Sequence, residues 1–331
     1  WMSKGGAYEE TAVLYRSNAQ SRAIEEALLR VSIPYRIYGG LRFYERLEIK
    51  NAIAYLKIIF NNSDNPSFER SISNPTRGVG EKTLGKIRQT AQKYNISYIK
   101  ASAKLIDEGS ISGRGGSGLR DYLEFVAGCK SFIEENSLSD LMELIIKESG
   151  LYSYHAKEAG EKGKTRTENL EELITATKNF EQSIREEKTN AEIAENYLDV
   201  ISLDAGDRQA SEHDDAAQLM TMHSAKGLEF KLVLLTGLEE SLFPHGRSME
   251  SASQLEEERR LCYVAITRAM EKLYITHAES RRLHGNDTFN PPSRFLREIP
   301  KDLIDEIRPR AQTNIPYNRK DFNETKVEFE E

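Results

Sequence analysis

The chain has 331 residues, of which 38% are hydrophobic and 30% are charged, and its 46 basic and 53 acidic residues give a net charge of −7. This length suffices for two domains, and the composition is typical of a globular protein with a large core. A negative total does not exclude nucleic acid, because binding depends on where the positive charge lies. Cys129 and Cys262 stand far apart, and no HExxH pattern occurs, which argues against a disulfide framework and a metal site. No apolar run approaches the roughly 20 residues that a membrane span needs.

The first sixty residues alternate between strand and helix patterns, predicted at 11–15, 18–29, 35–38 and 45–60. A β-α-β-α order is typical of a doubly wound α/β domain. From about Asn61 the pattern becomes helical throughout, and further helices are predicted at 119–134, 138–149, 169–188 and 190–201.

Three connections within this helical region stand out. Residues 74–80 resemble the turn of a helix-hairpin-helix, in which Gly78 and Gly80, beside Arg77, let backbone N–H groups approach a DNA phosphate. A glycine-rich connection between packed helices explains the same residues equally well. Residues 109–118 are rich in glycine and serine and predict a flexible link. Residues 160–166 predict a basic loop in which Arg166 touches a duplex backbone, or else a solvated loop.

No phosphate-binding loop is encoded in the chain. The fragment Gly163-Lys164-Thr165 lacks the required earlier glycine, because Glu158 stands at that position. The motif GxxxxGK[ST] does not occur elsewhere in the sequence. Polar residues 204–215 then predict a linker that leads back to an α/β pattern.

Residues 216–276 carry the densest pattern of the chain. A strand at 219–223, a polar loop at Lys226-Gly227 and a strand at 231–236 precede a helix with apolar residues at 255, 262 and 266. A strand follows at 274–276, then a closing turn and helix near 291–295. The return to alternation predicts that the helical region is inserted into one α/β domain.

Three blocks in this order resemble motifs of superfamily 1 helicases of the UvrD/PcrA/Rep group, with UvrD members the most similar. The blocks are LYRSNAQSR at 14–22, MHSAKGLEF at 222–230 and EEERRLCYVAITRA at 256–269, which look like motifs IV, V and VI. The resemblance implies a RecA-like, P-loop NTPase-type parallel sheet that lacks its own P-loop and is interrupted by an all-helical domain. The second RecA-like domain would comprise residues 1–109 and 206–305. The helical insertion would comprise residues 110–205, although its start could lie anywhere between 61 and 110. A polar, disordered tail is expected at 306–331.

The resemblance also implies a nucleotide site for ATP with Mg²⁺, whose metal ligands belong to the family's N-terminal half. Arg16 and Arg268 match two arginines that reach the γ-phosphate, a role that suits the bidentate guanidinium group. Tyr15 matches an aromatic stacked on adenine, although a core tyrosine is the alternative. Glu229, preceded by Gly227, matches a carboxylate that binds the ribose hydroxyls. A surface salt bridge is the alternative for Arg268.

For DNA, the resemblance places Thr221, His223 and Ser224 in the groove that binds single strands, and Arg42 is a further candidate. A core histidine is the default alternative for His223. The run Glu256–Glu258 predicts interaction with the helix dipole and with Arg259 and Arg260 rather than a metal site.

The resemblance therefore implies the C-terminal portion of an ATP-dependent 3′–5′ DNA helicase that translocates on single-stranded DNA and unwinds duplex in DNA repair and replication. The expected partners are single-stranded DNA, single-strand/duplex junctions and DNA repair proteins, with no membrane, in a monomer or weak dimer of the bacterial cytoplasm. The chain alone is expected to be inactive as an ATPase. The alternative is a non-catalytic module that binds DNA or a partner protein, and a helicase–nuclease relative is disfavoured because no carboxylate cluster follows Arg294.

Overall fold

The computed structural model of this chain describes residues 1–184, 188–206, 210, 214–283 and 286–307. Residue contacts divide the chain into one unit at Trp1–Leu296 and a second at Arg297–Glu331, of which the structure describes a short 3₁₀ helix at Lys301–Leu303. The predicted disordered tail falls almost wholly on residues outside the described part. No helix among the described residues has the length and apolar character needed to cross a membrane.

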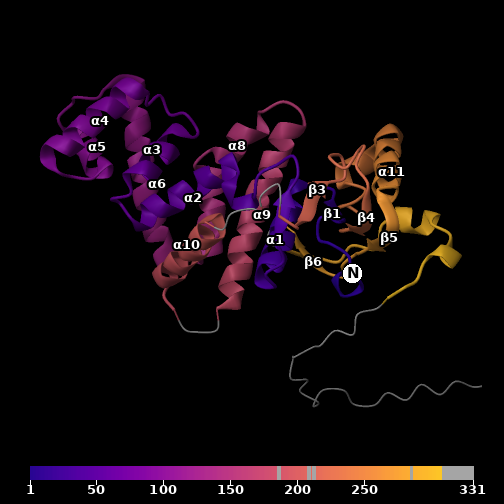
Figure 1. Cartoon of the computed structure of the whole chain (residues 1–331). Coiled ribbons are helices and arrows are strands. Elements are labelled where there is room, and N and C mark those ends of the chain that lie inside the picture. Colours follow the sequence, from indigo (N-terminus) through magenta and orange to yellow (C-terminus); the bar gives the residue numbers. More distant parts are fainter. Residues whose placement is uncertain (185–187, 207–209, 211–213, 284–285, 308–331) are drawn as a thin grey trace, which may run out of the picture. The chain divides into compact units, whose positions relative to one another are not determined.

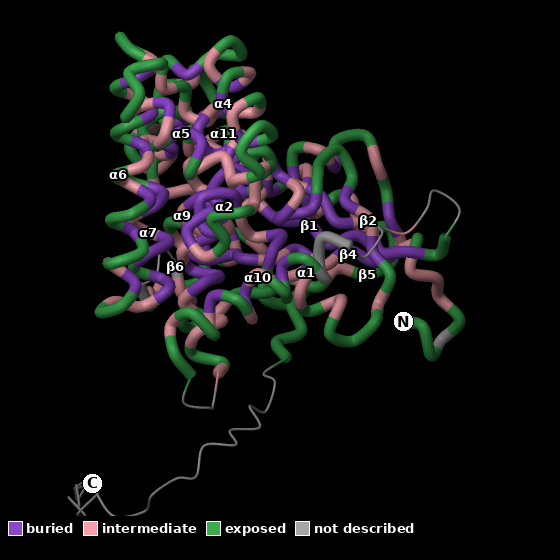
Figure 2. Tube along the Cα trace, turned by 90° about the vertical axis from the view of Figure 1, so that its left-hand side faces the viewer, coloured by how far each residue is buried: buried purple, intermediate pink, exposed green. Residues whose placement is uncertain are grey.

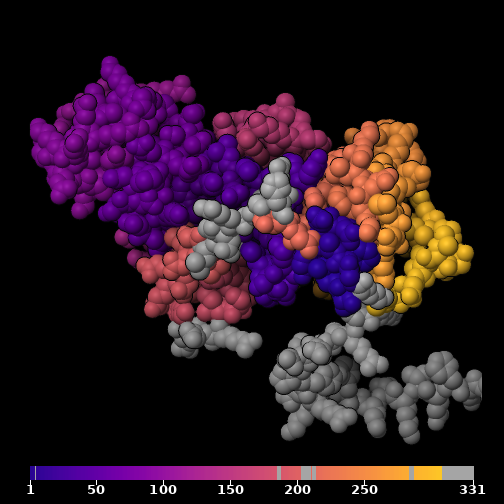
Figure 3. Space-filling model, in the orientation of Figure 1, coloured from indigo at the N-terminus to yellow at the C-terminus, as the bar shows by residue number. Residues whose placement is uncertain are grey.

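Five parallel strands form the sheet of the first unit, in the spatial order β2-β3-β1-β4-β5. Figure 1 labels β3, β1, β4 and β5 of this sheet. Their bounds are Thr11–Tyr15 for β1, Tyr35–Ile37 for β2, Ala217–Thr221 for β3, Phe230–Leu235 for β4 and Ala269–Ile275 for β5. The central strand β1 pairs with β3 and β4, which come much later in the chain. The space-filling view shows the N-terminal residues (indigo) beside these later segments (orange) (Figure 3).

Helices cover both faces of this sheet. Because successive strand residues point to opposite faces, Val13 and Leu219 pack with Leu28 of α1 (Ser21–Arg30), whereas Leu14 and Met220 pack with Cys262 of α11 (Ala252–Ile266). Buried parallel strands read as continuous apolar runs, and all five residues of β1 are buried. The predicted doubly wound α/β architecture is therefore present.

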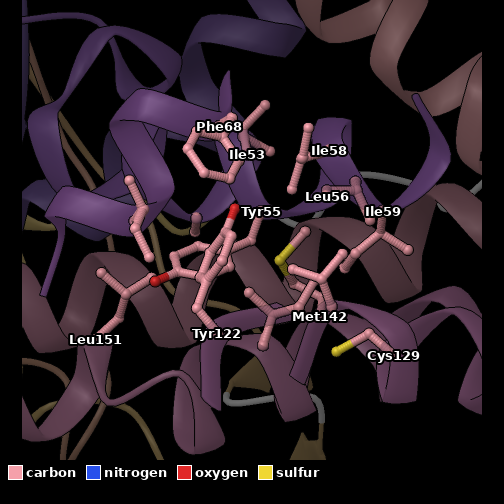
Figure 4. Close-up of a cluster of buried hydrophobic side chains, with 14 of the residues drawn as sticks. Ile53, Tyr55, Leu56, Ile58, Ile59, Phe68, Tyr122, Cys129, Met142 and Leu151 are labelled. Atoms are coloured by element: carbon pink, nitrogen blue, oxygen red, sulfur yellow. The ribbon is translucent and has the colours of Figure 1, made fainter. Parts of the chain in front are cut away.

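Nine α-helices lie between β2 and β3 in the chain, among the residues that the structure describes. They are α2 (Leu47–Phe60), α3 (Asn65–Ser73), α4 (Glu81–Tyr94), α5 (Tyr98–Asp107), α6 (Gly113–Glu135), α7 (Leu138–Glu148), α8 (Leu151–Ala156), α9 (Glu161–Ser183) and α10 (Asn190–Gly206). Their common core begins at Phe43 and ends at Ile201. Figure 2 shows buried residues along α2, and Figure 4 shows Tyr55, Phe68 and Tyr122 of this core turned toward one another. The sequence pattern placed α2 beside the sheet, but its buried side chains belong to the helical core. The domain boundaries given above stay predictions.

The glycine-rich segment 109–118 is not the predicted flexible link, because α6 begins at Gly113. Glycine is needed there for close packing rather than for flexibility. A Cβ atom on Gly118 would lie 2.0 Å from the carbonyl oxygen of Arg77, and one on Gly115 would lie 3.0 Å from that of Gly78. The first turns of α6 therefore rest directly on the backbone of residues 77–78.

Three smaller differences affect the connections. The predicted basic loop at 160–166 is the first turn and a half of α9, which begins at Glu161. The predicted linker at 204–215 is helical as far as Gly206, where α10 ends, and most of its remainder falls outside the described residues. An antiparallel pair that the sequence did not suggest, β6 (Arg281–Leu283) with β7 (Asn286–Thr288), follows the sheet.

Candidate nucleotide and nucleic-acid sites at two ends of the sheet

Strands β1 and β3 end side by side and bring Arg16 close to the Thr221–Ser224 turn. The register pairs Tyr15 with Thr221, so the next residues of both strands emerge at the carboxyl end of the sheet. The Thr221 and Ser224 hydroxyls lie 2.9 Å apart, and the Ser224 backbone N–H donates to the Thr221 hydroxyl at 3.2 Å. His223, between them, has an exposed side chain. Ligands of open α/β sheets bind at this end of the strands.

The Arg16 guanidinium is held by Glu258 of α11. Its Nε atom donates to both carboxylate oxygens at 3.1 and 3.0 Å, and Nη2 donates to Oε1 at 2.7 Å. Both side chains are largely buried, with 13% of Arg16 and 6% of Glu258 exposed. Burial alone would raise the pKa of Glu258, but the hydrogen bonds and charge of Arg16 leave that pKa lowered. The pair is therefore charged at neutral pH.

A pocket of about 330 Å³ lies against this arginine. Residues at the ends of β1 and β3, among them Arg16, Thr221 and His223, line it together with Lys164 of α9 and with His245, which precedes the 3₁₀ helix Gly246–Glu250. Although His223 is exposed overall, the protein covers part of its ring, which lowers its pKa, and the positive charge of Arg16 lowers that pKa further. His223 is consequently neutral at pH 7, and it can act as a hydrogen-bond donor to a phosphate without adding charge.

A second group lies at the opposite, amino end of the sheet. Gly227 takes a φ of +86°, which only glycine adopts readily, and Glu229 leads directly into β4 with an exposed side chain. Arg268, which immediately precedes β5, donates from Nη1 to the Leu228 carbonyl at 2.8 Å and from Nε to the Val264 carbonyl at 2.9 Å. The described residues include no carboxylate paired with Arg268, so the surface salt bridge considered above is not seen.

The structure does not bring Arg16 and Arg268 together. The register places Thr11 opposite Leu232. Glu229 precedes Leu232 by three residues, and Arg16 follows Thr11 by five, so the Cα atoms of Glu229 and Arg16 are about 25 Å apart along the strands, at roughly 3.3 Å per residue. Arg268 lies at the Glu229 end, because it bonds to the Leu228 carbonyl. Since an arginine side chain reaches only a fraction of this distance, shared contact with one γ-phosphate stays a prediction.

Tyr15 lies beneath the surface instead of lining an open site. Its side chain is completely buried in the cluster that includes Tyr35 and Leu219, on the sheet face covered by α1. Burial raises the pKa of its hydroxyl. This environment is that of a core tyrosine, and the stacking of Tyr15 on adenine stays a prediction.

Two predicted DNA-binding arginines are engaged within the protein. Arg42 is 2% exposed, with Nε 4.0 Å from a Glu25 carboxylate oxygen and its guanidinium carbon 5.7 Å from the centre of the Tyr35 ring. Arg166 forms an ion pair with Glu158 at 2.6 Å. Their contacts with DNA stay predictions, and DNA would have to compete with these partners for both side chains.

The segment 74–80 combines a fixed arginine with exposed glycines. Arg77 donates to the carbonyl oxygens of Pro75 at 3.0 Å and Ser149 at 2.7 Å, so it anchors the segment to the helical core. Gly78 has a φ of +75°, and Gly80 is the N-cap residue of α4; both are exposed. Arg77 thus anchors the segment, and its contact with DNA stays a prediction, whereas the two glycines leave backbone accessible to a phosphate at a helix N-terminus.

Sequence reasoning missed the role of Glu258. Glu256 and Glu257 pair with Arg259 and Arg260, as predicted, but Glu258 is buried and binds Arg16, and none of the three carboxylates lies in the first turn of α11. The signal was available in the helical spacing, because Glu258 shares the buried face with Leu255 and Cys262.

The fold is that of a RecA-like α/β domain: the sheet is parallel, candidate arginines lie near both of its ends, and the described helices α2 to α10 interrupt it along the chain. The family model of the UvrD-like helicase C-terminal domain matches residues 1–112 and 119–280. The chain belongs to this family, and the predicted RecA-like fold class is confirmed.

Curated relatives agree with this assignment. The chain is 46% identical over 328 residues to "DNA helicase II" of Escherichia coli (strain K12), which covers 99% of the chain and 45% of that protein. It is 48% identical over 311 residues to "DNA helicase II" of Haemophilus influenzae, covering 94% of the chain and 42% of the relative. It is 39% identical over 313 residues to "ATP-dependent DNA helicase PcrA" of Bacillus subtilis (strain 168), again covering 94% and 42%. The chain spans less than half the length of these relatives.

Proposed function

We propose that this chain is the C-terminal portion of an ATP-dependent DNA helicase that moves 3′ to 5′ on single-stranded DNA. The observation that carries the proposal is the placement of the two sets of motif residues at opposite ends of one family-typical sheet. A motor needs separate nucleotide and DNA contacts that one rigid element can link. Here α11 supplies Glu258, which holds Arg16 at one end, and leads into Arg268 at the other.

The amino end of the sheet is the proposed nucleotide side. Glu229 would bind the ribose hydroxyls, the flexible geometry of Gly227 would permit close approach, and Arg268 would stabilise charge on the γ-phosphate of ATP. Its present carbonyl partners orient the guanidinium without neutralising it. Mg²⁺ would accompany ATP and take its ligands from the family's N-terminal half.

The carboxyl end is the proposed DNA side. Thr221, His223 and Ser224 would donate to phosphates of a single strand, and we assign Arg16 to the same groove instead of to ATP. The basis for this assignment is its place beside Thr221 and its distance from Arg268. Gly78 and Gly80 would contact the duplex at a single-strand/duplex junction.

The proposed cellular setting rests on the resemblance of the motifs to helicases of the UvrD/PcrA/Rep group. We propose a cytoplasmic enzyme of DNA repair and replication that acts as a monomer or weak dimer and recruits repair proteins. ATP would draw the RecA-like domains together, and hydrolysis would release them, so that alternating grip at residues such as His223 becomes stepwise movement.

The proposal is tested in a chimaera in which this chain replaces the matching segment of the Escherichia coli relative. We expect DNA-stimulated ATP turnover, and we expect Arg268→Ala to reduce turnover by about a hundredfold or more while nucleotide binding and folding are kept. Arg260→Ala is the matched control, because Arg260 is exposed and pairs only with the neighbouring Glu257 among the described residues. Equal turnover in the two variants would refute the role of Arg268.

The isolated chain provides a second test. It carries no GxxxxGK[ST] sequence, so we expect it to bind single-stranded DNA without hydrolysing ATP. Strong DNA-stimulated hydrolysis by the pure chain would contradict this expectation. DNA binding by the chain combined with an inactive chimaera would instead support the alternative of a non-catalytic binding module.

A further inference from the structure

The contact between Arg16 and Glu258 is built from both sides. The backbone N–H of Arg16 donates to the Gln20 side chain at 3.0 Å, which fixes the start of the arginine. The Glu258 carboxylate accepts from the His245 backbone N–H at 3.3 Å and from the Ser248 hydroxyl at 3.4 Å, so it is fixed independently of Arg16. Holding a long side chain at both ends removes rotamer freedom that would otherwise be lost on binding a ligand.

The geometry leaves one edge of the guanidinium available. Glu258 engages Nε and Nη2, and no partner of Nη1 is recorded among the residues that the structure describes. A guanidinium presents donors on more than one edge, so it can bind a carboxylate on one side and a phosphate on another. Arg16 also lines the pocket that contains Lys164, Thr221 and His223.

The charges of the pair are oriented with respect to this pocket. At His223, the effect of Arg16, which lowers the pKa, exceeds the opposing effect of Glu258. The positive end of the pair is therefore nearer His223 than the negative end is. Lys164, from the first turn of α9, adds a second positive group to the same lining. Two carboxylates also lie there: Glu161, 3.8 Å from Lys164, and Glu168, which accepts a hydrogen bond from the Ser17 hydroxyl at 2.5 Å.

We infer that Glu258 is a positioning residue for DNA binding: it holds the Nε edge of Arg16 so that the Nη1 edge meets a phosphate of single-stranded DNA in this pocket. The inference rests on the proposed function, because it requires Arg16 in the DNA groove. The rival explanation is that Glu258 neutralises Arg16 and weakens anion binding. The two explanations predict opposite changes when the carboxylate is removed.

The experiment measures the affinity of the chain for a short fluorescein-labelled oligothymidine by fluorescence anisotropy over a range of salt concentrations. We expect Glu258→Gln to weaken binding about three- to tenfold, which is the effect of losing part of one charge-assisted hydrogen bond. Glu257→Gln is the matched control, because it removes the same charge from the preceding residue, whose side chain is exposed. We expect this variant to bind DNA no more weakly than the unmodified chain. Glu258→Asp keeps the charge but shortens the side chain, so it should weaken DNA binding as well. If Glu258→Gln does not fold, Glu258→Asp is compared with Glu257→Gln in its place.

Arg16→Gln separates this inference from the proposed function. We expect it to weaken binding about tenfold and to reduce the salt slope by about 0.7, the value for one single-strand phosphate contact. In the Arg16→Gln background, Glu258→Gln should have no further effect, whereas a purely structural role of Glu258 would still lower affinity there. Arg16→Gln could weaken DNA binding while Glu258→Gln binds DNA as tightly as Glu257→Gln or more tightly. That result would overturn the positioning role of Glu258 and would keep the assignment of Arg16 to the DNA groove. If Arg16→Gln binds like the unmodified chain, the assignment of Arg16 to the groove fails, and the inference fails with it.

Discussion

Replacing Gly118 by alanine should destabilise the protein, although alanine is the better helix former. In an open helix position, glycine to alanine stabilises by about 0.5–1 kcal/mol. At Gly118 the new Cβ would lie 2.0 Å from the Arg77 carbonyl oxygen and 3.0 Å from its carbonyl carbon. Because these are backbone atoms, no side chain can rotate away, and α6 or the segment 77–78 must shift. Overpacking of this kind costs about 1–3 kcal/mol, so we expect a net loss of about 1–2 kcal/mol.

Gly128 provides the matched control in the same helix. No atom lies within 4 Å of its ideal Cβ position, and the residue is exposed, so Gly128→Ala should stabilise by about 0.5–1 kcal/mol. Urea unfolding followed by circular dichroism would show a lower midpoint for Gly118→Ala and a higher midpoint for Gly128→Ala, with similar slopes. If the two variants were equally stable, α6 would not rest on the 77–78 backbone, and our explanation of the glycine-rich segment would be wrong.

Three further outcomes are expected. Tyr122→Phe should cost about 1 kcal/mol in the same urea assay, because it removes the buried hydrogen bond, 2.6 Å long, to Ser71; an unchanged midpoint would contradict that bond. Burial raises the pKa of Cys129 to about 12, so its thiol should resist alkylation at pH 8 until urea unfolds the protein, as peptide mapping would reveal. The pKa of Glu258 is lowered from 4.5, so its pairing with Arg16 stabilises the folded state above that pH and is lost as pH falls through the folded value. Glu258→Gln should therefore flatten the loss of stability below about pH 4.5, and an unchanged acid limb would argue against the pair.

Those parts of the fold with a strong local pattern were predictable from sequence. The strand β1 is a run of buried apolar residues, and the motif around His223 fixed a strand, a turn and a second strand in the right order. The glycine-rich start of α6 was not predictable, because its reason is a distant backbone, at residues 77–78, that only the folded chain brings into contact.

The arrangement of the candidate site shows the same limit. Resemblance identified Arg16 and Arg268 as functional candidates, and their shared contact with one phosphate stays a prediction, but resemblance did not indicate that the two residues lie near opposite ends of the sheet. Strand register determines which end of the sheet each residue occupies, and register is set by pairings between residues far apart in the chain. The burial of Glu258 was predictable from helical spacing, but its partner was not, because Arg16 lies on another strand–helix connection.

The sheet is assembled from two pieces of chain with the helices between them, and this order affects how the protein is made. During synthesis, β1 leaves the ribosome long before β3 and β4, its two neighbours, exist. The helical core, by contrast, is contiguous from Phe43 to Ile201 and has only short connections to close. The helices can therefore fold first, while an apolar strand with two unpaired edges waits at the N-terminal side. Until its partners emerge, that strand is exposed to aggregation, from which a chaperone could protect it.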